Sequence, residues 1–112
     1  MADAYDELTQ HIGRKVRASD VATAAPMRGM MVTFDRQEPE PSPGQAIPPG
    51  WHLMYFLPMF RPTELAADGL AVTTGVIPKM PFPRRMFAGT RMRFVKPICV
   101  GDTLTREPIL PD

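Results

Sequence analysis

The apolar positions between residues 24 and 35 recur at the spacing of an α-helix. Four large apolar side chains follow the i, i+3, i+4, i+7 pattern: Met27, Met30, Met31 and Phe34. This pattern places all of them on one helical face. Thr23 is a suitable N-cap residue, and Pro26 suits the first turn because its missing N–H has no helical partner there. The sequence therefore predicts a helix over residues 24–35 with an apolar stripe facing a core.

Three other stretches have the apolar character of strands. Residues 90–95 alternate arginine with apolar side chains, which is typical of a half-buried antiparallel strand. A Gly-Asp turn at Gly101 then precedes a further strand that begins over residues 103–106. Residues 51–60 form a nearly unbroken apolar run, WHLMYFLPMF, interrupted at Pro58. Its aromatic content favours a buried strand over a helix.

The remaining segments read as short elements and loops. Residues 4–12 favour a short terminal helix, and residues 14–17 could form a short strand. Residues 37–49 contain EPEPSPGQAIPP, which is too rich in proline for helix or strand and predicts turns and polyproline-like coil at the surface. Residues 61–75 are loop-like, with a turn at Asp68-Gly69.

Length and composition suit a small domain with a modest core. The 112 residues predict a single domain, residues 1–112, and the 14 prolines and 9 methionines predict an irregular, adaptable core of marginal independent stability. The single cysteine cannot form an internal disulfide, which fits a reducing compartment. No apolar run approaches the ~18 residues of a membrane span, and the acidic N-terminus does not resemble a signal peptide. These features predict a soluble, cytoplasmic protein.

Charge is balanced overall but uneven along the chain. A net charge of +1 gives no general attraction to nucleic acid. Between Asp68 and Asp102, however, the sequence has no acidic residue and several basic ones: Lys79, Arg84, Arg85, Arg91, Arg93 and Lys96. Guanidinium groups pair bidentately with phosphate oxygens, so this segment is a candidate site for a phosphorylated ligand. The alternative is a solvated face that contacts carboxylates of a partner.

Common catalytic and metal-binding motifs are not found in the sequence. Two isolated histidines and one cysteine have no metal-ligand spacing, and there is no Gly-rich phosphate loop, serine elbow or paired-carboxylate motif. His52 lies inside an aromatic run, where a histidine bonded to a backbone carbonyl is expected more often than a general base. Cys99 lies two residues after Pro97, in a predicted strand, and is expected to be an inert core thiol.

Four stretches resemble one protein family: SDVATAAPMRGMMVTFD, PPGWHLMYFLP, PFPRRMFAG and RMRFVKPICVGDTL. They resemble the N-terminal module of MaoC-like hot-dog hydratases and dehydratases. The closest subgroup includes mesaconyl- and 3-methylfumaryl-CoA hydratases and type 2 hydroxyacyl-thioester dehydratases. The similarity extends over about residues 12–107, with the GWH…YFLP and P-RRM-AG segments the most specific.

The resemblance implies an α+β hot-dog fold, with an antiparallel sheet wrapped around the helix at residues 24–35 and incomplete at its C-terminal end. Family members commonly pair two such modules, and the second supplies a catalytic histidine and an acidic residue. This chain has no stretch that matches that motif, so the resemblance implies no catalytic residue here. It implies a module that shapes an acyl-CoA pocket for a catalytic partner, with two groups of contacts. The acyl group would contact Trp51, Tyr55, Phe56 and Met86. The CoA phosphates would contact Arg84 and Arg85.

Two alternatives to this interpretation remain open. The chain could be an acyl-thioester-binding or regulatory hot-dog protein without catalysis, or an incomplete remnant with no activity of its own. For the module and for the binding protein, the expected ligand is a coenzyme A thioester, with no other cofactor, no metal, no nucleic acid and no membrane. The expected assembly is a homo- or hetero-oligomer formed through the sheet. The sequence leaves open which acyl group is bound and whether the chain is an enzyme by itself.

Overall fold

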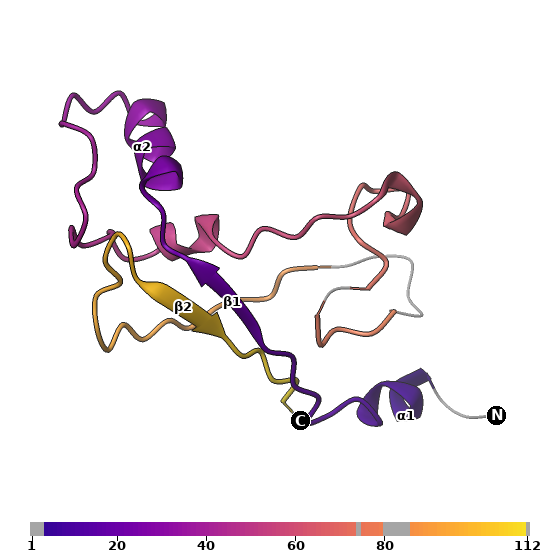
Figure 1. The fold of residues 1–112 in the computed structure, drawn as a ribbon. Helices are drawn as coiled ribbons and strands as arrows, with labels where there is room; N and C mark the ends of the chain where they lie inside the picture. Colours follow the sequence, from indigo (N-terminus) through magenta and orange to yellow (C-terminus); the bar gives the residue numbers. More distant parts are fainter. Residues whose placement is uncertain (1–3, 74, 80–85, 112) are drawn as a thin grey trace. The chain divides into compact units, whose positions relative to one another are not determined.

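A computed structural model describes residues 4–73, 75–79 and 86–111 (Figure 1). The chain divides into two compact units. The first unit comprises Met1–Arg17, Pro58–Gly89 and Glu107–Asp112. The second unit comprises Ala18–Leu57 and Thr90–Arg106. That residues 1–112 form a single domain stays a prediction.

The second unit contains a two-stranded antiparallel sheet of β1 (Ala18–Val21) and β2 (Thr103–Arg106), which lie side by side in Figure 1. The register places Ala18 opposite Arg106 and Val21 opposite Thr103. The predicted strand at residues 103–106 is confirmed. The turn before it is also confirmed, with Gly101 at a φ of 99°, a conformation that glycine adopts without strain.

Helix α2 (Ala24–Thr33) confirms the helix predicted at residues 24–35. Thr23 occupies the N-cap position, although its side chain makes no capping hydrogen bond. At the other end Asp35 adopts a left-handed φ of 56°, and the Arg36 N–H donates to the Met31 carbonyl over 2.9 Å. This is the Schellman arrangement, which satisfies carbonyls that the last helical turn would otherwise leave unpaired.

Two members of the predicted apolar stripe, Met27 and Met31, face the core of the second unit, whereas the prediction is wrong for Phe34. Met27 and Met31 are each only 3% exposed, whereas Phe34, beyond the last turn, is 59% exposed. The buried core consists of small and medium apolar side chains together with one tyrosine: Ala22, Met27, Met31, Ile47, Tyr55 and Val100. This core joins the helix to the sheet and to the long connection that follows the helix.

The predicted strand over residues 51–60 is wrong. Trp51–Met54 forms a 3₁₀ helix, η1, and no helix or strand continues it. Gly50 precedes η1 with a φ of 92°, and the Tyr55 N–H donates to the His52 carbonyl over 3.1 Å. Because these local turn bonds use the backbone groups, the segment does not join a sheet. A short aromatic run has no periodicity that could distinguish the two outcomes.

The predicted strand over residues 90–95 is also wrong. These residues form no helix or strand, and in the described part of the chain no backbone hydrogen bond involves residues 90–97. Alternating side chains predict an extended segment, but a strand also requires a neighbour that completes its backbone hydrogen bonds. Residues 37–49 have no helix or strand, as their proline content predicts.

The first unit contains helix α1 (Ala4–Thr9) and the 3₁₀ helix η2 (Pro62–Glu64). Helix α1 is shorter than the predicted residues 4–12. The predicted strand at residues 14–17 is reduced to an isolated bridge between Lys15 and Ile109. The turn predicted at Asp68-Gly69 is confirmed, with Gly69 at a φ of 84°.

The described elements make the chain a mixed α+β protein with little regular structure. Residues 4–73, 75–79 and 86–111 contain one two-stranded sheet. In the same residues, no helix has the length and apolar character needed to cross a membrane.

Candidate functional site: an apolar slot

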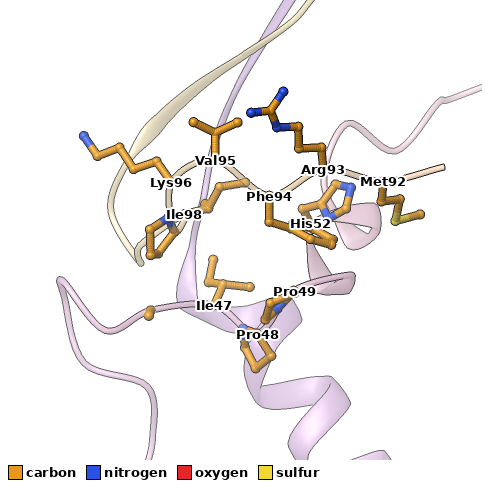
Figure 2. A pocket seen from close by; sticks show the side chains of 12 residues that line it. Ile47, Pro48, Pro49, His52, Met92, Arg93, Phe94, Val95, Lys96 and Ile98 are labelled. Carbon is orange, nitrogen blue, oxygen red and sulfur yellow. The ribbon is translucent and has the colours of Figure 1, made fainter.

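The second unit contains a cavity of about 710 Å³ between residues 46–49 and residues 92–98 (Figure 2). We call this cavity the apolar slot. It is lined by Ala46, Ile47, Pro48, Pro49, His52, Met92, Arg93, Phe94, Val95, Lys96, Pro97 and Ile98. Most of these side chains are apolar, and the volume lies within the range of small-molecule sites.

Backbone pairing holds the two walls of the slot together at one end. The Ile47 N–H donates to the Ile98 carbonyl over 2.7 Å, and Ala46 forms an antiparallel bridge with Cys99. The side chain of Ile47 belongs to the buried core, whereas Phe94 is about half exposed. The wall around residues 46–49 is therefore anchored to the core, and residues 92–96 form the more exposed wall.

His52 contributes the imidazole that lines the slot. Its ring meets the Phe94 ring edge to face, with centroids 5.8 Å apart and an interplanar angle of 74°. The sequence suggested a backbone carbonyl as the partner of this imidazole. In the described residues no hydrogen bond involves the imidazole, and its defined neighbour is the Phe94 ring. Its ring nitrogens are therefore available to a bound molecule.

Two basic residues belong to the more exposed wall. Figure 2 shows the side chains of Arg93 and Lys96 projecting to the side opposite Ile47 and Pro48. The lining contains no acidic residue. The slot is thus an apolar space in a basic setting, which suits a ligand that combines an apolar group with negative charge elsewhere.

Asp20 of β1 anchors the segment that carries His52. One carboxylate oxygen, Oδ2, accepts a hydrogen bond from the Phe56 N–H over 2.8 Å, and the other, Oδ1, accepts one from the Val21 N–H over 2.8 Å. The N–H groups of Phe56 and Val21 hold the pKa of Asp20 below its usual value, against a smaller opposing effect of burial. The ionised carboxylate therefore fixes the end of the segment that begins with η1.

Tyr55 adds a second anchor to the same segment. Its hydroxyl donates to the Thr23 carbonyl at the start of α2 over 2.6 Å. Burial, and then the negative charge of Asp20, raise the pKa of Tyr55 above its ordinary value. The hydroxyl therefore stays protonated and able to donate at neutral pH.

We expect the second unit to lose stability at acidic pH, because the Asp20 carboxylate anchors it in the ionised form. A lowered folded-state pKa contributes stability above the unfolded-state value of about 3.9, and this contribution disappears as the pH falls through the folded-state pKa. The melting temperature should therefore fall as the pH drops below about 5, and Asp20→Asn should show a smaller fall over the same range. Thermal unfolding followed by circular dichroism at each pH measures both. Equal pH dependence in the two proteins would exclude this role for Asp20.

The aromatic residues predicted to contact an acyl group lie together in the second unit, but they do not line the slot. Trp51 packs against Phe34 with ring centroids 6.1 Å apart, and the Arg36 guanidinium lies 5.3 Å from the Trp51 ring centroid. Tyr55 is buried in the core. Phe56 has a left-handed φ of 56° and packs under the Arg106 guanidinium at 5.0 Å. Their role as ligand contacts stays a prediction.

The other predicted contacts lie elsewhere or outside the described residues. Met86 belongs to the first unit and is 90% exposed. Arg84 and Arg85 lie outside the described residues. Sequence reasoning did not assign the slot residues Ile47, Phe94 and Ile98 to a site. The sequence signal that could have indicated the slot was the apolar face of residues 90–95, because the alternation placed Met92 and Phe94 on the same side.

The structure offers no grouped metal ligands in the part of the chain that it describes. There, no set of three or more histidine, cysteine or acidic residues is placed to hold a metal ion. Cys99 is a free, partly buried thiol, and its backbone N–H donates to the Asp102 carboxylate over 2.9 Å.

An apolar cavity of this volume with an imidazole in its lining is typical of sites that accept a small, largely apolar ligand. The sequence profile of the type 2 hydroxyacyl-thioester dehydratases, Htd2, matches residues 50–110. The chain belongs to this family.

A curated relative supports the same relationship. The chain is 36% identical over 99 residues to a mesaconyl-C(4)-CoA hydratase of Chloroflexus aurantiacus. The aligned region covers 88% of this chain and 35% of the relative, so the chain spans about a third of that protein's length. The family match includes η1, the more exposed slot wall and β2.

Proposed function

We propose that this chain is a hot-dog module that binds the acyl group of a coenzyme A thioester and shapes the pocket for a hydratase or dehydratase reaction. The observation that carries the proposal is the apolar slot, because residues 92–98 and His52 lie inside the region that matches the thioester dehydratase family. The relative's name supports a coenzyme A thioester as the ligand.

The chemistry of the slot supports a binding role, with catalysis supplied by a partner. Hydration of a carbon–carbon bond beside a thioester requires a positioned general base and general acid. Among the residues that line the slot, His52 is not accompanied by an aspartate or glutamate that could share this task. We therefore assign acyl binding to this chain and proton transfer to a partner module. Arg84 and Arg85 are the proposed contacts of the CoA phosphates, and Trp51, Tyr55, Phe56 and Met86 the further proposed acyl contacts.

Truncating one aromatic side chain of the slot wall, that of Phe94, tests this function. We expect Phe94→Ala to weaken the binding of butyryl-CoA by about five- to thirtyfold. The variant would lose the apolar contact between the ring and the acyl group, which contributes roughly 1–2 kcal/mol to the free energy of binding. Phe94 is about half exposed, so the fold should tolerate the change. Isothermal titration calorimetry with butyryl-CoA and with free coenzyme A measures the affinity of the acyl group separately from that of the nucleotide.

Phe87→Ala is the matched control, because Phe87 is a largely exposed phenylalanine of the first unit. It should leave the affinity for butyryl-CoA unchanged. A wild-type chain that binds butyryl-CoA no better than free coenzyme A would contradict acyl binding. Equal losses in the two variants would contradict the assignment of the slot.

A binding protein without catalysis is the second candidate function, and the same absence of an acidic residue from the slot lining favours it. Native mass spectrometry of the tagged chain recovered from its own cells separates the two. Recovery with a second, histidine-bearing hot-dog chain supports the module of a hydratase. Recovery as a homo-oligomer supports the binding protein.

A further inference from the structure

The position of His52 has a consequence for the orientation of a ligand. The slot walls are mainly hydrocarbon, and they fix the place of an apolar chain without fixing its direction. In sites of this kind a small number of polar groups set the orientation. His52 lies toward the Met92 end of the slot, whereas Lys96 lies toward the other end (Figure 2). A ligand would therefore meet different chemistry at the two ends.

The imidazole is also held in a defined place without a competing hydrogen bond. It is carried by η1, and the Phe94 ring packs against it at 5.8 Å. An imidazole has at least one N–H donor in either protonation state, so His52 can always donate to an acceptor oxygen. Arg93 and Lys96 carry other donors, but their side chains project away from Ile47 and Pro48 in Figure 2. His52 is thus a donor of the lining that packs directly against an apolar wall residue, Phe94.

We infer that His52 donates a hydrogen bond to the thioester carbonyl oxygen of the bound ligand, with the acyl chain lying between Ile47 and Phe94. This inference rests on the proposed function and adds a residue that sets specificity for a carbonyl. It makes His52 a binding residue that recognises the thioester group itself. Binding of an otherwise identical ligand without the carbonyl should then be weaker, because the donor would be buried without a partner.

A pair of ligands isolates this bond. Butyryl-CoA and S-butyl-CoA have the same carbon skeleton, and the second has a methylene group in place of the carbonyl. We expect the wild-type chain to bind butyryl-CoA roughly tenfold more tightly than S-butyl-CoA, the size of one well-formed hydrogen bond. His52→Phe keeps a ring against Phe94 and removes the donor. This variant should bind the two ligands with nearly equal affinity and should retain the wild-type affinity for S-butyl-CoA.

His11→Phe is the matched control, because His11 lies in the first unit outside the slot. It should keep the tenfold preference. A second measurement on the wild-type chain avoids any dependence on the folding of a variant. The ring signals of His52 in a proton–nitrogen NMR spectrum should shift more with butyryl-CoA than with S-butyl-CoA, and those of His11 should not shift.

The outcomes distinguish the two proposals. An unchanged preference in His52→Phe, or equal His52 signals with the two ligands, would overturn the role of His52 and leave acyl binding intact. Equal affinity of the wild-type chain for butyryl-CoA and S-butyl-CoA would also overturn the role of His52 and leave acyl binding intact. Failure of the wild-type chain to bind either ligand would overturn the proposed function, and the role of His52 with it.

Discussion

Replacing Met31 with alanine is expected to lower the free energy of unfolding of this chain by about 2–4 kcal/mol. Met31 is 3% exposed and packs in the core of the second unit with Met27 and the side chains that surround them. Its truncation removes apolar contacts and leaves a cavity that a small core can fill only in part. The buried core is small, consisting of Ala22, Met27, Met31, Ile47, Tyr55 and Val100. Few neighbouring side chains can therefore shift to fill the cavity.

Thermal and urea unfolding measure this loss. For a domain of this size, a loss of 2 kcal/mol corresponds to a fall in melting temperature of about 8–16 °C. Val32→Ala is the control on the same helix, because Val32 is 66% exposed and should change stability by less than about 0.5 kcal/mol. Similar losses in both variants would show that the helix does not bury its methionine face as described.

The double substitution Arg84→Ala with Arg85→Ala is expected to weaken acyl-CoA binding by roughly ten- to a hundredfold. Each hydrogen bond between a guanidinium and a phosphate contributes about 1.5–3 kcal/mol in favourable geometry, and exposure to solvent reduces this value. The loss should shrink as the salt concentration rises, because salt screens exposed charges. Calorimetry with butyryl-CoA at low and high salt, on the chain and on its complex with a partner, measures both effects.

Arg14→Ala with Arg17→Ala is the charge-matched control. It removes the same charge from residues outside the segment that matches the thioester dehydratase family. This control should reduce the affinity by less than about twofold, through long-range electrostatics alone. An unchanged dissociation constant for the Arg84 and Arg85 variant would exclude these residues as phosphate contacts. Equal losses in the two double variants would point to net charge and away from a specific site.

Local patterns predicted the parts of the fold that local interactions determine. The methionine stripe of α2 and the Gly-Asp turn before β2 were confirmed because helix period and turn chemistry are properties of neighbouring residues. The proline-rich connection at residues 37–49 was confirmed for the same reason, since proline removes backbone donors wherever it stands.

The two wrong strand predictions have a common physical origin. An aromatic run such as residues 51–60 and an alternating run such as residues 90–95 can both be extended, but a strand requires a partner with free backbone groups. At η1 the local turn bonds satisfy those groups instead. At residues 90–95 the described chain supplies no neighbouring strand. The alternation of side chains at residues 90–95 does not show whether a distant segment will pair with them, and the aromatic run does not show whether local turn bonds will form instead.

The candidate site shows the same division. The resemblance to a thioester dehydratase family was visible in the order of residues along the chain, without knowledge of the fold. The family match confirmed it. The sequence singled out His52 and treated it as structural, because its surroundings in the chain are apolar. Its Phe94 neighbour lies far along the chain, so the contact between the two rings exists only in the folded protein.

The sequence by itself determined the family, helix α2 with its buried Met27 and Met31, and the strand over Thr103–Arg106. These follow from residue identity and short-range spacing. The tertiary structure alone decided that residues 46–49 and 92–98 enclose a slot, and that Asp20 anchors the segment carrying His52. The reason is that a cavity and a long-range hydrogen bond are formed by segments that the chain brings together only on folding, at a cost in loop-closure entropy that no local pattern records.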